Sequence, residues 1–158
     1  MKIEDNTTYK QTREVLALAR TLYRKLAGFY AARKESLTDE RVTMLMTYME
    51  RHEQQMQEVL TETMSNVADQ TLDTYYQFQP EDIAVLLDVE QWHIDPDIDI
   101  DEMIATVMRF DDILRDYYKR ASQMTDNPQV LEVFENLMRL EEEKRNREAR
   151  DALSLKDL

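Results

Sequence analysis

Two charged side chains are placed on the apolar side of the last predicted helix, in the segment RLEEEKRNREAR over residues 139–150. Counting helical turns from the preceding DNPQVLEVFENLM puts Glu141 and Lys144 on the same face as Val133 and Leu137. A carboxylate that faces a protein core can bind a metal ion, and an ammonium beside it can form a buried ion pair instead. The spacing therefore predicts a buried polar site that neighbouring helices complete.

The composition favours long helices as the elements that position this site. The 158 residues include one Gly and three Pro, with ten Met and many Leu, Glu, Arg and Ala, which are residue types that favour helices. Apolar side chains recur every three or four residues in four segments. We expect helices over about 8–35, from Thr38 or Asp39 to Val67, from Asp99–Asp101 to Ala121, and from Asp126 or Asn127 to about Ala152. The predicted fold class is all-α.

Two short loops and one long connection arrange these helices as two αα-hairpins. The hairpins span 8–67 and 99–152, and the crossover between them spans 70–98. Within the crossover, PEDIAVLLDVEQW predicts a short helix that begins at Pro80. Four helices with one long crossover have the topology of the ferritin-like four-helix bundle, and residues 1–158 are expected to form a single domain.

The two hairpins also resemble each other. A shift of 88 residues, which carries Glu53 onto Glu141, also carries Tyr30 onto Tyr118. The aromatic residues, the loops and the inward glutamates coincide better than the helical period alone requires. The match indicates an ancient duplication of one hairpin, and it extends the predicted polar site to Glu53 on the second helix.

The second hairpin, DILRDYYKRASQMTDNPQVLEVFENLMRLEEEK, resembles the rubrerythrin branch of the ferritin-like superfamily. The shared pattern is a carboxylate seven residues before an aromatic residue, a D-x-P-x-V loop, a Phe, and then Glu-x-x-His. The resemblance covers about 35 residues, and it reaches the first hairpin only through the internal repeat. It implies a di-iron site inside the bundle, with a glutamate from each of the first and third helices and a Glu-x-x-His pair from each of the other two.

Several of the metal positions that the resemblance implies have changed in this chain. The positions fall on Tyr23, Glu53, Met56, Asp111, Glu141 and Lys144. Met56 and Lys144 replace both histidines, and Tyr23 replaces the first glutamate. A protonated lysine cannot bind a metal, and a thioether is a poor ligand for iron. We therefore expect the ammonium of Lys144 to replace the positive charge of the metal and to offset the three carboxylates, with Tyr23 hydrogen-bonded to the cluster.

A rival interpretation keeps a metal ion, either iron or manganese, at the remaining oxygen ligands. Its candidate ligands are Glu53, Asp111, Glu141, Tyr23 and His52. His52 lies one residue before Glu53 and could turn inward, although a partly buried, hydrogen-bonded histidine is the simpler role. The first interpretation predicts a binding or structural protein without a catalytic residue or a cofactor. The second predicts a rubrerythrin-like oxidoreductase or an iron-binding protein.

The net charge and the residue types argue against several other functions. A net charge of −13 disfavours nucleic acid and anionic membrane surfaces as partners. The chain has no cysteine, which excludes disulfides and thiolate metal sites, and no apolar segment approaches the length of a membrane span. We expect a cytoplasmic protein whose protein partner, if it has one, the sequence does not identify.

Aromatic residues in the crossover bear on whether the protein forms a dimer. Tyr75, Tyr76, Phe78 and Trp92 either cover one end of the bundle or form a contact between two chains. Because the bundle core offers little further surface to crossover residues, we expect a homodimer.

Overall fold

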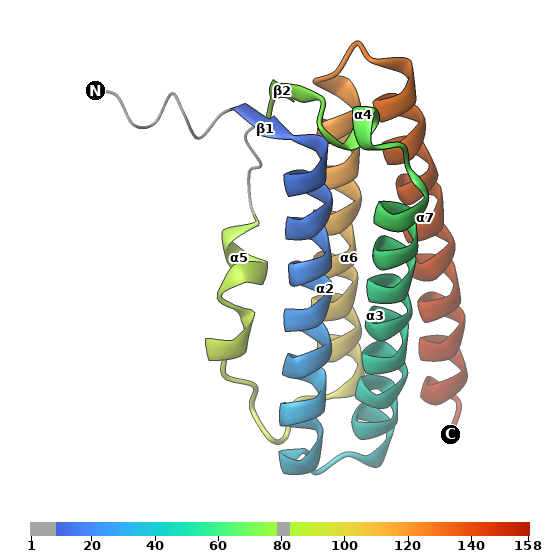
Figure 1. Cartoon of the computed structure of the whole chain (residues 1–158). Helices are drawn as coiled ribbons and strands as arrows, with labels where there is room; N and C mark the ends of the chain where they lie inside the picture. Colours follow the sequence, from blue (N-terminus) through green and yellow to red (C-terminus); the bar gives the residue numbers. More distant parts are fainter. Residues whose placement is uncertain (1–8, 79–82) are drawn as a thin grey trace.

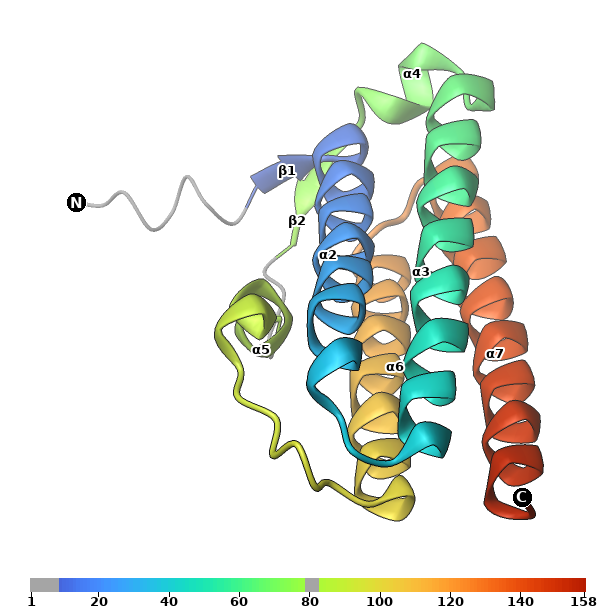
Figure 2. The ribbon, with the colours of Figure 1, turned by 90° about the horizontal axis from the view of Figure 1, so that it is seen from below.

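The regular structure in the computed structural model, which describes residues 9–78 and 83–158, is almost entirely helical (Figure 1). Four long helices carry most of the chain: α2 (Thr12–Arg33), α3 (Glu40–Asn66), α6 (Ile100–Gln123) and α7 (Pro128–Lys156). The all-α prediction is confirmed. The four helices lie side by side in both views of the ribbon (Figure 1, Figure 2). The connection after α3 carries the chain back to the opposite end of the molecule, where α6 begins (Figure 1).

Side-chain spacing explains how the four helices pack. Each helix buries a stripe of residues three or four positions apart, such as Leu22 and Leu26 on α2 and Leu114 and Tyr118 on α6. Helix α2 packs against α3, α6 packs against α7, and α3 also contacts α7. The buried stripes therefore meet in one core that all four helices share.

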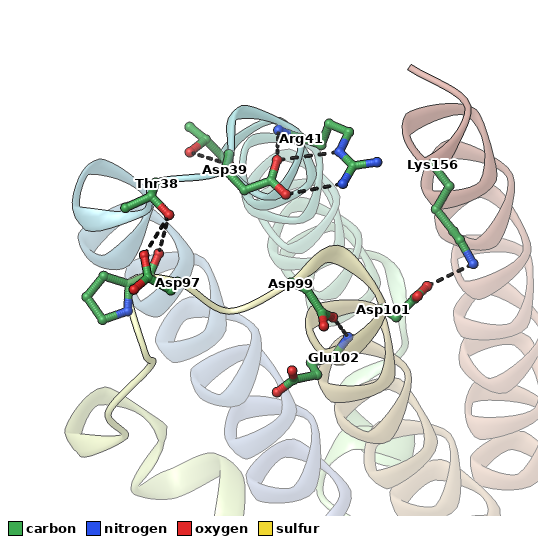
Figure 3. A network of polar contacts seen from close by, with 10 residues as sticks. Thr38, Asp39, Arg41, Asp97, Asp99, Asp101, Glu102 and Lys156 are labelled. Atoms are coloured by element: carbon green, nitrogen blue, oxygen red, sulfur yellow. Dashed lines mark hydrogen bonds and ion pairs between the residues drawn. The ribbon is translucent and has the colours of Figure 1, made fainter.

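At the start of α3, Asp39 rather than Thr38 is the N-cap residue. The carboxylate of Asp39 accepts a hydrogen bond from the backbone N–H of Arg41 at 2.9 Å, so Asp39 is the N-cap (Figure 3). The hydroxyl of Thr38, the other candidate, donates instead to the carbonyl of Pro96 at 3.2 Å and to Asp97 at 3.0 Å (Figure 3). These hydrogen bonds of Thr38 connect the α2–α3 loop to the segment that leads into α6.

Acidic residues at the start of α6 are used for capping and for one ion pair. Asp99 accepts a hydrogen bond from the backbone N–H of Glu102 at 2.8 Å and caps the helix (Figure 3). Asp101 lies 2.8 Å from the ammonium of Lys156 near the end of α7 (Figure 3). A carboxylate at a helix N-terminus is also favoured by the helix dipole. These contacts account for the acidic sequence that precedes the third long helix.

The expectation that the first helix extends back to about residue 8 is wrong for residues 9–11. Strand β1 (Tyr9–Gln11) pairs antiparallel with strand β2 (Tyr75–Gln77), with Lys10 opposite Tyr76. The backbone groups of these residues are therefore engaged by the crossover, and α2 begins only at Thr12. Residue 8 lies outside the described residues.

Over its described residues, 70–78 and 83–98, the crossover contains only short elements: α4 (Asp69–Leu72), strand β2, α5 (Ala84–Leu87), and a 3₁₀ turn at Val89–Gln91. A second 3₁₀ turn, Lys34–Ser36, follows α2. The predicted helix start at Pro80 lies outside the described residues.

Three of the four crossover aromatics pack on the same chain. Tyr76 and Phe78 are buried, with ring centroids 6.4 Å from Phe134 and 5.3 Å from Tyr117, respectively. Trp92 lies 5.4 Å from Phe110 between ring centroids, whereas Tyr75 is exposed. Tyr76 and Phe78 thus cover the core of their own chain.

Among the residues described, no helix combines the length and the apolar character needed to cross a membrane.

Candidate functional site: a buried lysine among four carboxyl groups

Lys144 on α7 lies at the centre of a polar cluster inside the helical core. Its side-chain nitrogen Nζ is 2.5 Å from Glu53 Oε1 on α3, 3.1 Å from Asp111 Oδ1 on α6, and 3.3 Å from Glu141 Oε1 on α7. None of these four side chains is more than 2% exposed. One ammonium therefore contacts three carboxyl groups that three different helices supply.

The local sequence explains why charged residues point inward here. Glu53 lies between Met49 and Met56 on the buried stripe of α3, four residues after the first and three before the second. Asp111 has the same relation to Val107 and Leu114 on α6. The helical period therefore carries each carboxylate into the core together with its apolar neighbours.

Two tyrosines complete the cluster on the side of Glu141. The hydroxyl of Tyr23 on α2 donates a hydrogen bond to Glu141 Oε1 at 2.6 Å, and the hydroxyl of Tyr118 on α6 donates to the hydroxyl of Tyr23 at 3.1 Å. The Nζ of Lys144 also lies 5.1 Å from the centroid of the Tyr23 ring, within the range of a cation–π contact. All four long helices thus contribute to the site.

Glu148 is the site residue that the sequence did not assign to the cluster. It lies on the buried face of α7, one turn after Lys144, and its side chain is fully buried. One oxygen each from Glu148, Glu53 and Asp111 lie within 4.8 Å of one another. The signal was in the sequence, because Glu141, Lys144 and Glu148 follow the three- and four-residue spacing of the α7 stripe.

Several carboxyl oxygens in the cluster have no hydrogen-bond partner. They are both oxygens of Glu148, Oδ2 of Asp111 and Oε2 of Glu141. A buried carboxylate oxygen without a partner is costly, so such a group tends to hold a proton or to bind a cation. The site therefore has more acceptors than its own donors satisfy.

The surrounding carboxyl groups keep Lys144 charged. Burial alone would lower the pKa of Lys144, because a buried ammonium loses its hydration. The negative charges of Asp111, Glu141 and Glu53 outweigh this effect and raise the pKa well above its ordinary value. Lys144 therefore carries a positive charge at neutral pH.

One positive charge does not keep all four carboxyl groups ionised. Burial raises the pKa of Glu53 to about 7 and that of Glu141 to about 8, although Lys144 opposes both shifts. Burial, together with the neighbouring Asp111, raises the pKa of Glu148 well above its ordinary value. The cluster therefore holds protons at neutral pH.

The tyrosine at the site stays in its donor form. Burial and the charge of Glu141 raise the pKa of Tyr23 well above its ordinary value. Tyr23 is therefore a neutral phenol that donates a hydrogen bond, and its oxygen is not available as a phenolate ligand.

His52 and Met56 were also candidate site positions in the sequence, but neither makes a polar contact with Lys144. The Nε2 of His52 is 3.3 Å from Asp151 Oδ2 near the surface, and burial lowers the pKa of this imidazole. Met56 is buried within the apolar core. Neither residue contributes to the one group of metal-binding side chains found among residues 9–78 and 83–158.

The arrangement does not fit a pair of iron ions. The di-iron site that the resemblance implies needs two imidazoles and four carboxylates, whereas the α7 histidine position is Lys144 and the α3 histidine position is Met56. The charged Nζ of Lys144 also lies between the carboxylates of Glu53, Asp111 and Glu141, where the implied pair of iron ions would have to bind all three. No protein-family model, curated protein or solved structure matches this chain.

Proposed function

We propose that this chain is a ferritin-like four-helix bundle of the rubrerythrin-like branch with a binding or structural role, and that Lys144 replaces the metal ions of a lost di-iron site. In this proposal the cluster stabilises the bundle and transfers no electrons. Two features of the chain support the assignment to this branch: two helical hairpins joined by a long crossover, and the Glu141-x-x-Lys144 spacing on α7.

The position of Lys144 is the observation that carries the proposal. Its Nζ lies within 3.3 Å of carboxylates from α3, α6 and α7, so a fixed positive charge already occupies the centre of the ligand set. An ammonium can balance negative charge as a metal ion does, but it cannot change oxidation state or activate oxygen. A catalytic role in oxygen or peroxide reduction therefore lacks its reactive centre.

An anaerobic iron titration tests the proposal. Protein freed of metals would be titrated with Fe(II), and oxygen consumption would then be measured after addition of air. We expect the wild-type protein to consume oxygen no faster than the same iron in buffer.

The variant Lys144→His restores Glu-x-x-His on α7 and serves as the matched comparison. We expect this variant to bind more iron than the wild type, because the substitution removes the fixed ammonium and adds an imidazole ligand. Two iron ions bound per wild-type chain, with rapid oxygen consumption, would instead support the rubrerythrin-like oxidoreductase.

A further inference from the structure

The cluster around Lys144 has an excess of negative groups. Glu53, Asp111, Glu141 and Glu148 surround a single ammonium, and all five side chains are buried. Inside a protein, unbalanced charges interact strongly because water does not screen them. The excess must therefore be neutralised by bound protons or by a further cation.

Glu141 and Glu148 differ in what their oxygens contact. Glu141 Oε1 accepts from Tyr23 at 2.6 Å and lies 3.3 Å from Lys144. When ionised, Glu148 finds no donor for either of its oxygens, and neither Oδ2 of Asp111 nor Oε2 of Glu141 finds one. Three of these four unused acceptors thus belong to Glu148 and Asp111.

We propose that Glu53, Asp111 and Glu148 form a binding site for one divalent cation beside Lys144. One oxygen from each of the three residues lies within 4.8 Å of the others. Oxygen ligands lie about 2.0–2.6 Å from ions such as Mg²⁺ and Ca²⁺, so two ligands of one ion can be up to about 5 Å apart. Carboxylates from three helices converge at this spacing.

The chemistry of the ligands selects the class of cation. The three side chains offer only carboxylate oxygens, which suit Mg²⁺, Ca²⁺ and Mn²⁺. The soft thiolates and the imidazoles that favour zinc or copper do not contribute to this group. The inferred ion is therefore a hard divalent cation with a structural role.

The charges support a single ion of this class. When Glu53, Asp111 and Glu148 bind a cation, the three ligand carboxylates would carry three negative charges, of which Lys144 offsets one and a divalent cation the other two. The three ligands, Lys144 and one ion together would be neutral.

This inferred site differs from the di-iron site implied by the resemblance. Glu148 has no counterpart in the Glu-x-x-His pattern, and the site uses neither Glu141 nor Tyr23. The inference goes beyond the proposed function, because Lys144 keeps its place and its charge when the cation binds. Binding of one such ion without iron-dependent oxygen consumption is compatible with both proposals.

Equilibrium binding of Mn²⁺ tests the inference. The protein would be unfolded in urea with a chelator and refolded without it, because the site is closed and a cation must enter before or during folding. Free Mn²⁺ would be counted by electron paramagnetic resonance after refolding in increasing Mn²⁺, with Mg²⁺ and Ca²⁺ as competitors. We expect one Mn²⁺ per chain.

Two single substitutions separate a ligand from an exposed glutamate on the same helix. Glu148→Gln removes a ligand and keeps the shape of the protonated side chain, so it should fold without metal and bind Mn²⁺ roughly tenfold or more weakly. Glu143→Gln, the exposed control on α7, should keep the wild-type stoichiometry. Circular dichroism would show that both variants remain helical.

Two results would overturn it. They are the lack of saturable binding up to roughly 1 mM Mn²⁺ and equal loss of binding in Glu143→Gln and Glu148→Gln. Protons alone would then neutralise the cluster, and the proposed role of Lys144 would stand. Failure of the iron and oxygen experiment, by contrast, would remove that role whether or not Mn²⁺ binds.

Discussion

Lys144 is the only cationic side chain among the fully buried charged residues of the described ranges. Removing an ammonium from water costs several kcal/mol, and only close, well-placed carboxylates offset that cost. Glu53 and Asp111 provide such contacts at 2.5 and 3.1 Å. Lys144 alone therefore provides the counter-charge for the carboxyl groups of the core.

The hydrogen bond from Tyr23 to Glu141 leads to a prediction for the substitution Tyr23→Phe. The substitution keeps the ring and removes the hydroxyl donor, so the buried Oε1 of Glu141 loses this hydrogen bond. We expect the free energy of unfolding to fall by about 1–3 kcal/mol, measured by urea denaturation.

Tyr76→Phe is the matched control for this prediction. The hydroxyl of Tyr76 is buried without a hydrogen-bond partner, so its removal should leave stability unchanged or raise it slightly. An equal loss in both variants would mean that the Tyr23 hydroxyl contributes no specific interaction to the cluster.

At the scale of the elements, the start of α7 gives a prediction about capping. The side chain of Asn127 accepts hydrogen bonds from the backbone N–H groups of Gln129 at 2.9 Å and Val130 at 3.2 Å. Asn127→Ala should lower the free energy of unfolding by about 1 kcal/mol, as judged from the urea midpoint. Asp126→Ala, one residue earlier, should have a smaller effect. The reverse order of the two variants would contradict this assignment of the cap.

The helical elements could be predicted because their signals are local. Repeating apolar spacing located the four long helices, and capping residue types narrowed the starts of α3 and α7 to two candidates each. Strand β1 could not be predicted in this way, because its partner Tyr75–Gln77 lies more than 60 residues later in the chain. The choice of Asp39 over Thr38 as cap likewise depended on a contact with Pro96 and Asp97, remote in sequence.

The candidate site could be predicted in part for the same reason. Helical spacing placed Glu141 and Lys144 on the buried face of α7, and the internal repeat added Glu53. The same spacing extends to Glu148. The relative heights of α3, α6 and α7 depend on tertiary packing, so the sequence did not show that Glu148 lies next to Asp111. The position of His52 beside Asp151, outside the cluster, depends on the same packing.

At the scale of the whole molecule, the buried carboxyl groups predict how stability depends on pH. The pKa values of Glu53 and Glu141 are raised from 4.5 to about 7 and about 8 in the folded protein. The folded state therefore binds more protons than the unfolded state between about pH 4.5 and 8. The contribution of these groups to stability is fully present below pH 4.5 and is lost as the pH rises through about 8.

Urea denaturation from pH 5 to pH 9, in the presence of a chelator, checks this dependence. The free energy of unfolding should decrease as the pH rises, and the decrease should be smaller in Glu141→Gln, which removes one titrating group. A stability that increases with pH over this range would show that the cluster carboxyl groups are ionised and well compensated in the folded protein.

The homodimer stays a prediction. Tyr76 and Phe78, which were candidates for a contact between chains, are buried within their own chain. Exposed apolar side chains such as Tyr75 and Leu153 remain, and a dimer would remove some of them from water. Sedimentation equilibrium should give twice the chain mass of 18.9 kDa, and a mass of one chain at all concentrations would exclude the dimer.

The free energy of unfolding of Lys144→Met at pH 7, with a chelator present, tests the central claim most directly. Methionine has a similar length but no charge, so Glu53, Asp111 and Glu141 would lose their counter-charge. Stability should fall by about 3–5 kcal/mol, whereas the control Lys119→Met on the exposed face of α6 should change it by less than about 0.5 kcal/mol. Equal stability of Lys144→Met and the wild type would contradict the claim that this ammonium holds the core carboxyl groups together.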